Sequence, residues 1–308
     1  MSKRDLLKWK SGEMVAQVDA DVLLYSCAFA AQKTQWSYPD AAGVLAPFIG
    51  NKTELNAWCD TNDKDKTLAE SLVIPEPFAH AKRAYDMTLA KIVKESKADR
   101  YITYLTGKKN FRLDVCPDYK ANRKHVAKPY HYERLKEYIQ SRACTIVVNG
   151  MEADDAMGIA QFANHKALNS SQWSVICTID KDLDMIRGMH YNWNKDDLYY
   201  QAGGDAEVCF YRQLIMGDPT DNIKGIPKKG KKAADKVIDG SSSDPYRMYE
   251  QVRSMYFDYH YAETDSRSIK EVHEIADADL NKNAQLLWIM RHPTEHWTPP
   301  TKPEVVPL

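Results

Sequence analysis

Acidic residues gather in four short motifs along this sequence of 308 residues. The motifs are VDAD with Asp19 and Asp21, MEADD with Glu152, Asp154 and Asp155, TIDKDLD with Asp180, Asp182 and Asp184, and MGDPTDN with Asp218 and Asp221. Carboxylates brought together would repel one another unless hard cations neutralised them, and such oxygen ligands suit Mg²⁺ or Mn²⁺. Two such ions about 4 Å apart can activate a water and stabilise the departing oxygen of a phosphodiester. The motifs therefore indicate metal-dependent phosphodiester hydrolysis.

Each acidic motif also has a simpler interpretation when it is taken alone. Asp154 is placed to cap the helix that it opens, because a single Asp before a helix is commonly an N-cap. Asp21 and Asp184 can be interpreted as structural or solvent-facing residues. Asp218 and Asp221 can be interpreted as turn residues around Pro219. Four motifs that all fall at strand ends or helix starts make the metal-site interpretation the stronger one.

Basic residues are segregated from the acidic motifs, although the net charge is only -1. Residues 108–136 contain nine Lys or Arg against three Asp or Glu, and residues 224–236 contain six Lys against one Asp. A protein with a carboxylate metal site and separate basic clamps for a phosphate backbone would have this near-neutral sum.

The elements that position these motifs are short apolar strands that alternate with helices. Such alternation predicts an α/β fold with a parallel sheet. In a parallel sheet the residues just past the carboxyl ends of the strands meet at one edge, which would bring Asp19, Glu152 and Asp180 together. We expect a buried strand that runs into a helix in 15–25. Further strands are expected in 100–105, 145–148 and 174–179, and helices in 78–96, 130–140 and 154–166.

The rest of the chain gives weaker signals. Residues 33–77 look irregular and are interpreted as an insertion, whereas 205–239 looks helical with a Gly/Pro/Lys-rich break. The tail 298–308 carries four prolines and is expected to be disordered. We expect no membrane association, since no apolar run is long enough to span a bilayer. Six scattered cysteines without a secretory signal predict reduced thiols in a cytoplasmic protein.

The order of VDAD, PDYKANR, EADD, TIDKDLD and MGDPTDNIKGIPKKGKKAA resembles the 5′-nuclease family of flap endonucleases and 5′→3′ exonucleases, most closely its bacteriophage members. The resemblance covers about residues 14–240. It implies a PIN-like α/β fold with a parallel sheet flanked by helices. It also implies two divalent ions (Mg²⁺ or Mn²⁺) and a helix–three-turn–helix segment that grips duplex DNA.

The resemblance assigns metal-binding roles to the acidic motifs. The implied ligands are Asp19, Glu152, Asp154, Asp155, Asp180, Asp182, Asp218 and Asp221. The chain departs from the family at YLTGKKNF, where Thr106 or Gly107 stands in place of the usual Asp after the second strand. The first metal site is then one ligand short, or another residue such as Asp114 supplies it.

The resemblance also assigns roles to the basic motifs. Lys120 and Arg123 match basic residues near the scissile phosphate, where a cation can offset developing charge on phosphorus. Tyr119 offers an aromatic face on which a terminal base could stack. The implied DNA-binding residues are Tyr119, Lys124, Gly225, Lys228, Lys229, Gly230, Lys231 and Lys232. A K⁺ ion at the helix–three-turn–helix is a further candidate.

Together these features predict a PIN-like nuclease domain over 1–204, with an insertion at about 33–77 and an arch or clamp at 108–136. A helical DNA-binding region follows over 205–297, with the helix–three-turn–helix at about 213–239. The expected function is that of a phage-encoded 5′→3′ exonuclease and flap endonuclease of the host cytoplasm. Its substrate is DNA with a duplex part and a 5′ end or flap, or an RNA primer in an RNA–DNA hybrid. It would serve primer removal, recombination or host DNA degradation. The alternatives are a PIN-like ribonuclease and a catalytically impaired structure-specific DNA-binding protein.

Overall fold

The computed structural model describes residues 13–124, 126–166, 172–238, 244–264 and 268–302. These residues divide into two compact units that do not follow chain order. The first unit takes in the described residues up to 21, from 91 to 126 and from 143 onward. The second unit takes in residues 22–90 and 127–142.

A six-stranded sheet organises the first unit, in the order β6-β5-β1-β7-β8-β9. Its strands are β1 (Glu13–Asp19), β5 (Arg100–Asn110), β6 (Thr145–Gly150), β7 (Gln172–Cys177), β8 (Gly188–Asn192) and β9 (Asp197–Gln201). All neighbouring strands are parallel except β9, which pairs with β8 in the antiparallel sense. The predicted parallel sheet is confirmed, and the antiparallel edge strand is an addition that the sequence did not indicate.

Strand β1 lies at the centre of this sheet because it can be buried on both faces. Its segment MVAQVD is buried throughout, and it pairs with β5 on one side and β7 on the other. The register places Asp19 beside Tyr104 of β5 and Val18 beside Cys177 of β7. The carboxyl ends of these three strands therefore reach the same edge of the sheet, as the sequence predicts.

Helix α7 (Ala153–Lys166) covers one face of the sheet, where it contacts β1, β5 and β7. The contact is apolar, since Met157 of α7 packs with Ile176 of β7 and Tyr104 of β5. Helix α7 begins directly after β6, so its first turn carries Asp154 and Asp155 to the carboxylate edge. The predicted helix over 154–166 is confirmed.

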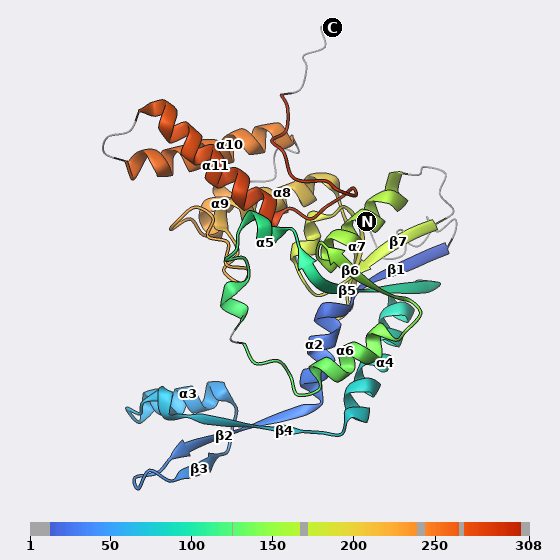
Figure 1. The fold of residues 1–308 in the computed structure, drawn as a ribbon, viewed down its shortest axis with the longest axis vertical. Coiled ribbons are helices and arrows are strands. Elements are labelled where there is room, and N and C mark those ends of the chain that lie inside the picture. The colour runs from blue at the N-terminus through green and yellow to red at the C-terminus, as the bar shows by residue number, and fades with distance from the viewer. Residues whose placement is uncertain (1–12, 125, 167–171, 239–243, 265–267, 303–308) are drawn as a thin grey trace. The chain divides into compact units, whose positions relative to one another are not determined.

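Four helices follow the sheet: α8 (Gly203–Met216), α9 (Lys231–Val237), α10 (Pro245–Ala262) and α11 (Ile269–Leu287). Helices α10 and α11 lie side by side (Figure 1), and both contact α8. They share a core with residues such as Phe210, Tyr256 and Leu280. The short segments α5 (Arg112–Val115), η2 (Ala121–Arg123) and η3 (Asp182–Met185) connect these elements in the same unit. This core fixes the place of the 217–230 turn between α8 and α9.

The second unit shows that the predicted irregular insertion is wrong. Residues 32–75 form the antiparallel sheet β3-β2-β4, with β2 (Gln32–Pro39), β3 (Leu45–Phe48) and β4 (Glu70–Pro75). Helix α3 (Lys52–Thr61) and the turn η1 (Lys66–Leu68) join β3 to β4. A small core of Tyr38, Leu55 and Cys59 holds the sheet to α3. The strands were missed because β4 exposes every residue and so lacks the alternation that marks a half-buried strand.

The second unit also contains parts of helices that the sequence did predict. Helix α4 (Phe78–Glu95) begins there, and α6 (Tyr132–Gln140) lies in it entirely. Helix α2 (Ala20–Ala30) starts in the first unit immediately after β1 and continues in the second. The predicted helices over 78–96 and 130–140 are thus confirmed with small changes at their ends.

Among the residues that the structure describes, no helix is long and apolar enough to cross a membrane. Residues 298–302 of the predicted disordered tail have neither helix nor strand, and residues 303–308 lie outside the described part.

Candidate active site

The carboxyl ends of β1 and β7 are joined by a chain of hydrogen bonds that runs through three predicted ligands. Thr178 follows β7, and its hydroxyl donates to Oδ2 of the buried Asp19 at 2.9 Å. The same hydroxyl accepts the backbone N–H of Asp180 at 3.0 Å. Asp180 Oδ1 in turn accepts the backbone N–H of Asp182 at 3.0 Å. Asp19, Asp180 and Asp182 are therefore brought to one place by the backbone path after β7.

The negative charges of neighbouring carboxylates at the same edge act on the side chain of Asp154. Burial raises the pKa of Asp154 well above its usual value, and the negative charges of Asp19, Glu152 and Asp180 raise it further. The positive charge of Lys120 acts to lower this pKa but does not outweigh burial and the neighbouring carboxylates. Asp154 is not the side-chain cap that a lone Asp at a helix start would be, and its charge is left for a cation to neutralise.

Asp182 is the link to the acidic pair that follows α8. Gln213 of α8 donates from Nε2 to Asp182 Oδ1 and to Asp218 Oδ2, at 3.2 Å each. Asp218 is also held by the backbone N–H of Thr220, which donates to its Oδ1 at 2.7 Å. No sequence signal indicates the role of Gln213, because an amide on a helix is common and only its neighbours in space define this one.

Glu152 and Asp221 form a second part of the site, where they are held by the PDYKANR motif. Lys120 donates to Glu152 Oε1 at 2.6 Å and lies 3.5 Å from Asp221 Oδ2. Arg123 forms a short ion pair with Asp221 Oδ1. Burial acts to raise the pKa of Glu152, but Lys120 and then Arg112 outweigh it and hold that pKa below its usual value. The predicted cations are therefore placed directly on the carboxylate edge.

Lys120 is fixed at this place by its backbone as well as by its charge. Its φ of 56° is left-handed, and its N–H donates to the carbonyl of Asp221 at 3.0 Å. Burial alone would lower the pKa of Lys120, but Glu152 and Asp221 raise it above the usual value. Lys120 therefore stays positively charged beside the site.

Tyr119 does not have the stacking role expected from the sequence. Its ring is buried, with an exposed fraction of 4%, inside the core made by the C-terminal helices. Its hydroxyl donates to Glu152 Oε2 and to Asp221 Oδ2, at 3.0 Å each. A base cannot stack on a ring with no free face, so Tyr119 positions the two carboxylates instead.

Asp155 also differs from the predicted metal ligand. Its side chain is fully buried and receives Arg112 Nη1 on Oδ2 at 2.6 Å and Arg112 Nη2 on Oδ1 at 2.9 Å. The backbone N–H groups of Glu152 and Met290 donate to the same two oxygens. With two donors on each oxygen and a guanidinium to balance the charge, Asp155 has no lone pair directed to a metal.

Arg112 is the functional residue that the sequence missed most plainly. It is 2% exposed and donates from Nε to the carbonyl of Leu286 and from Nη2 to the carbonyl of Trp288. It therefore ties the end of α11 to the first turn of α7. A lone Arg in a basic segment carries no sequence signal that separates it from the solvated lysines around it.

Strand β5 continues beyond the predicted end at 105 to Asn110, so Thr106 and Gly107, where the family has its Asp, lie within the strand. Backbone contacts and Asp21 occupy this place. Thr106 accepts the N–H of Ala153 on its hydroxyl at 2.9 Å and donates its own N–H to Asp21 Oδ2 at 2.9 Å. A Cβ on Gly107 would lie 2.4 Å from the carbonyl oxygen of Val148, so no carboxylate fits there. Asp114 is exposed. Asp21 is therefore the carboxylate placed beside Thr106.

Asp184 accepts a hydrogen bond from Tyr199 at 2.5 Å, which agrees with its expected structural role.

The donor set fits divalent cations in its chemistry. It consists of hard carboxylate oxygens, and the repulsion at Asp154 and Asp182 shows negative charge in excess of Lys120 and Arg123. The described part of the chain holds no group of three or more His, Cys, Asp or Glu side chains gathered at metal-binding distance. Hydrogen bonds from Thr178, Gln213, Tyr119 and Lys120 hold the carboxylates near one another. The carboxylates do not surround a single point.

The basic turn between α8 and α9 depends on two glycines that face each other. Gly217 has a φ of 71° and Gly225 a φ of 57°, and a Cβ on Gly225 would lie 2.2 Å from Gly217 N. Asp218 and Ile223 exchange both backbone hydrogen bonds across the turn at 2.8 Å. Gly225 is therefore a buried packing position and not the exposed DNA contact expected from the sequence.

The remaining predicted DNA contacts are on the surface. They are Lys124 after η2 and Lys228, Lys229, Gly230, Lys231 and Lys232 at the start of α9. Lys231 is paired with Asp235 at 3.0 Å, which lowers the net charge that it offers. The other lysines of this group are exposed and offer their positive charge to the solvent.

The titration of Asp182 predicts a pH dependence of stability. Burial, followed by the charges of Asp180 and Asp218, raises the pKa of Asp182 to about 7. Between the usual carboxyl range and pH 7 the folded protein therefore holds a proton that the unfolded chain has released. The free energy of unfolding, measured in EDTA, should fall as the pH rises from the usual carboxyl range to about 7, and it should level off above that pH.

Asp182→Asn should make this fall shallower, whereas Asp197→Asn, at an exposed carboxylate on β9, should leave it unchanged. Thermal melts of the three proteins across the pH range provide the measurement. Equal slopes for Asp182→Asn and the unaltered protein would contradict the assignment.

Comparison with known families confirms the resemblance seen in the motifs. Residues 79–199 match the model of the 5′-3′ exonuclease, N-terminal resolvase-like domain. The exodeoxyribonuclease of Enterobacteria phage T3 is 31% identical over 154 residues, which are 49% of this chain and 48% of that protein. The flap endonuclease of Escherichia phage T5 is 28% identical over 185 residues, covering 53% and 62% of the two chains. The chain spans about half the length of the phage exonucleases that it matches.

The fold itself is shared with solved structures of the phage T5 enzyme. A T5 5′-exonuclease with bound zinc gives a TM-score of 0.53 at 19% identity, and 89% of each chain is covered. A T5 flap endonuclease in complex with DNA and metal ions gives 0.53 at 18% identity, again over 89% of each chain. The predicted fold class of a mostly parallel sheet flanked by helices is thereby confirmed.

Proposed function

We propose that this chain, which carries a 5′-3′ exonuclease N-terminal resolvase-like domain at residues 79–199, is a 5′→3′ exodeoxyribonuclease with flap endonuclease activity. The observation that supports it best is the convergence of acidic residues from β1, α7, η3 and the 218–221 turn, with Lys120 and Arg123 placed directly on them. Such an edge can hold the negative charge of a phosphodiester only when cations are present. The named activities of the phage relatives agree with this chemistry.

The ligands that we propose for Mg²⁺ or Mn²⁺ lie in two groups. Asp19, Glu152 and Asp154 would hold one ion, with Asp21 beside the strand end that lacks a carboxylate. Asp180, Asp182, Asp218 and Asp221 would hold the other. The bound cations would lower the pKa of a water and offset the charge on the departing oxygen. Asp155 is left out of both groups because Arg112 occupies its oxygens.

The chain's own cations then orient the substrate. Lys120 and Arg123 would exchange part of their contact with Glu152 and Asp221 for the oxygens of the scissile phosphate. Charge-assisted bonds of this kind are stronger than neutral ones and stabilise charge that develops on the phosphorus oxygens. Hydrolysis would leave a 5′-phosphate and a 3′-hydroxyl.

The duplex part of the DNA would be bound by the basic turn, outside the carboxylate edge. We propose that α8, the 217–230 turn and α9 act as the helix–three-turn–helix and that Lys228, Lys229 and Lys232 contact phosphates without reading sequence. The 108–136 segment would act as the clamp for the 5′ end. A K⁺ ion at this turn and RNA primers as substrates are extensions of the same proposal. The phage relatives favour action in the host cytoplasm, in primer removal, recombination or host DNA degradation.

One nuclease assay tests this function. The full chain is incubated with Mg²⁺ or Mn²⁺ and a 5′-labelled duplex, a 5′-flap substrate or single-stranded RNA, and products are sized from each labelled end. We expect short 5′ products from the duplex and cleavage near the junction of the flap. Preferential cutting of the RNA would indicate the ribonuclease alternative. Binding of the flap without cutting would indicate a structure-specific DNA-binding protein.

A further inference from the structure

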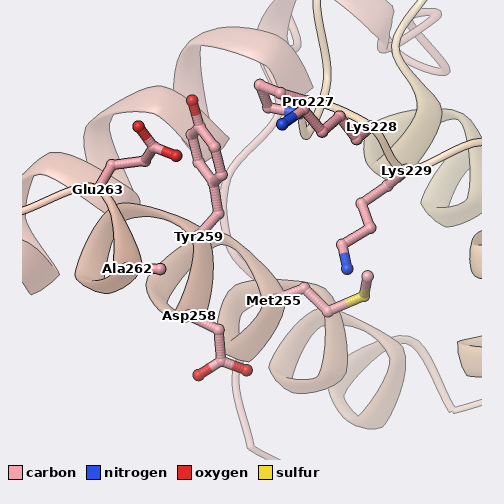
Figure 2. A pocket seen from close by; sticks show the side chains of 8 residues that line it. All are labelled: Pro227, Lys228, Lys229, Met255, Asp258, Tyr259, Ala262 and Glu263. Carbon is pink, nitrogen blue, oxygen red and sulfur yellow. The ribbon is translucent and has the colours of Figure 1, made fainter.

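A pocket lies between the basic turn and helix α10, outside the carboxylate edge. Its volume is about 420 Å³, and it is lined on one side by residues 227–229 and on the other by one face of α10 (Figure 2). This size falls in the range of about 300–1,000 Å³ that small-molecule sites occupy. The proposed cleavage chemistry does not use this space, although Lys228 and Lys229 of its lining are also proposed contacts to the duplex.

The wall of the pocket is apolar and held in place. Met255 and Tyr259 line it from α10, and both also pack against the core of the C-terminal helices. The Tyr259 ring stands upright along the pocket, and the Lys229 side chain extends toward Met255 (Figure 2). A flat aromatic ring beside a thioether offers a surface on which a planar ligand can stack.

Charges of opposite sign lie at different sides of this wall. Lys228 and Lys229 lie on the side of the turn, and the turn is fixed there by the Lys229 N–H, which donates to the Ile226 carbonyl at 3.1 Å. Asp258 and Glu263 lie on the side of α10. All four residues are exposed, so their polar groups face the solvent or a ligand.

We infer that this pocket binds one guanine nucleotide, with the base on Tyr259, the phosphate on Lys228 and Lys229, and the base edge on Glu263. A simple anion would meet the two carboxylates, and a simple cation would meet the two lysines. A nucleotide has an anionic phosphate at one end and N–H donors at the other, which matches both sides of the pocket. A carboxylate accepts only, and guanine offers it two adjacent donors, N1–H and the N2 amine, whereas thymine offers one.

Two sources share this chemistry: a free mononucleotide, and an unpaired guanosine in a strand next to a bound duplex. Only the second source rests on the proposed function. In that case the pocket would lie beside the duplex held by the same turn and would favour DNA with an unpaired guanine.

The test measures both sources with the full chain in EDTA. Equilibrium dialysis compares labelled dGMP, dTMP and inorganic phosphate. Fluorescence anisotropy compares a short blunt duplex with the same duplex carrying one unpaired dG or dT at both 3′ ends or at both 5′ ends. We expect dGMP, or the dG-bearing duplex, to bind at least about fivefold more tightly than its thymine counterpart.

Matched variants on α10 locate the effect. Tyr259→Ala should remove the gain, because stacking contributes much of a base's affinity. Glu263→Gln should bring the ratio of guanine to thymine affinity close to one. Tyr261→Ala, at a tyrosine that is 57% exposed and does not line the pocket, should keep the preference, as should Glu250→Gln.

A preference in one arm alone identifies the source. Equal affinity for guanine and thymine in both arms, phosphate binding as tight as that of dGMP, or equal loss in Tyr259→Ala and Tyr261→Ala would overturn the inference. Failure to cut or bind any duplex in the presence of metal would overturn the proposed function instead, and the dGMP arm would still decide whether the pocket binds a nucleotide.

Discussion

Asp180→Ala should lower the rate of flap cleavage by about 10³-fold or more, with little change in stability or in DNA affinity. The negative charge of Asp180 helps to raise the pKa of both Asp154 and Asp182. Its loss therefore removes a carboxylate from between the two proposed ion positions. A cation that stabilises the transition state contributes several kcal/mol, and each 1.36 kcal/mol is a factor of ten in rate. DNA affinity should persist because the proposed duplex contacts at Lys228, Lys229 and Lys232 are unchanged.

The measurement is the turnover of a 5′-flap substrate at saturating Mg²⁺, with the Kd for the uncut substrate measured in EDTA. Asp197→Ala, at an exposed aspartate on β9 of the same sheet, is the matched control and should cleave normally. Full activity in Asp180→Ala would refute the two-group carboxylate site. Loss of DNA binding along with cleavage would indicate a misfolded protein, which the thermal melt would show.

Asp155→Ala should act through stability and not through the chemistry. The substitution leaves the guanidinium of Arg112 buried with no counter-charge, and breaking a buried ion pair in this way costs about 3–5 kcal/mol. It also frees the N–H groups of Glu152 and Met290. We therefore expect a large fall in the denaturant concentration at the unfolding midpoint.

The neighbouring Asp154→Ala is the matched control, because burial and then the acidic neighbours raise the pKa of Asp154, so its removal relieves an unfavourable charge. Asp154→Ala should be as stable as the unaltered protein or more so, yet inactive. The double variant Arg112→Met/Asp155→Leu should recover part of the stability lost in Asp155→Ala, since it removes the unpaired charge. Similar unfolding midpoints for Asp155→Ala and Asp154→Ala would contradict the structural role of the pair.

The two substitutions separate adjacent residues that the sequence places in one motif. In EADD both aspartates stand at the start of a helix, one residue apart, and both look equally suited to a metal. Successive helical residues point about 100° apart, so only one of them can face the carboxylate edge while the other faces the core. The structure assigns the first role to Asp154 and the second to Asp155.

The apolar strand signals determined most of the sheet from the sequence alone. Residues 15–19, 100–105, 145–148 and 174–177 are short apolar runs followed by polar residues, and this local pattern is sufficient to predict parallel strands whose carboxyl ends share an edge. Asp19, Asp154, Asp180 and Asp182 could be selected for the same reason, because their places depend only on where a strand ends or a helix begins.

Only the tertiary structure decided which side chains meet across long separations. Hydrogen bonds join Arg112 to Asp155, Gln213 to Asp182 and Tyr119 to Asp221. The partners are separated by 43, 31 and 102 residues, respectively. Periodicity and propensity describe neighbours along the chain, whereas these pairs form because tertiary packing, such as that of α8 on η3 and of α11 on α5, carries them together. The carboxylates were therefore predictable as candidates, but which of them remain for the proposed ions, which are bridged by a neighbour and which are paired with Arg112 was set by the fold.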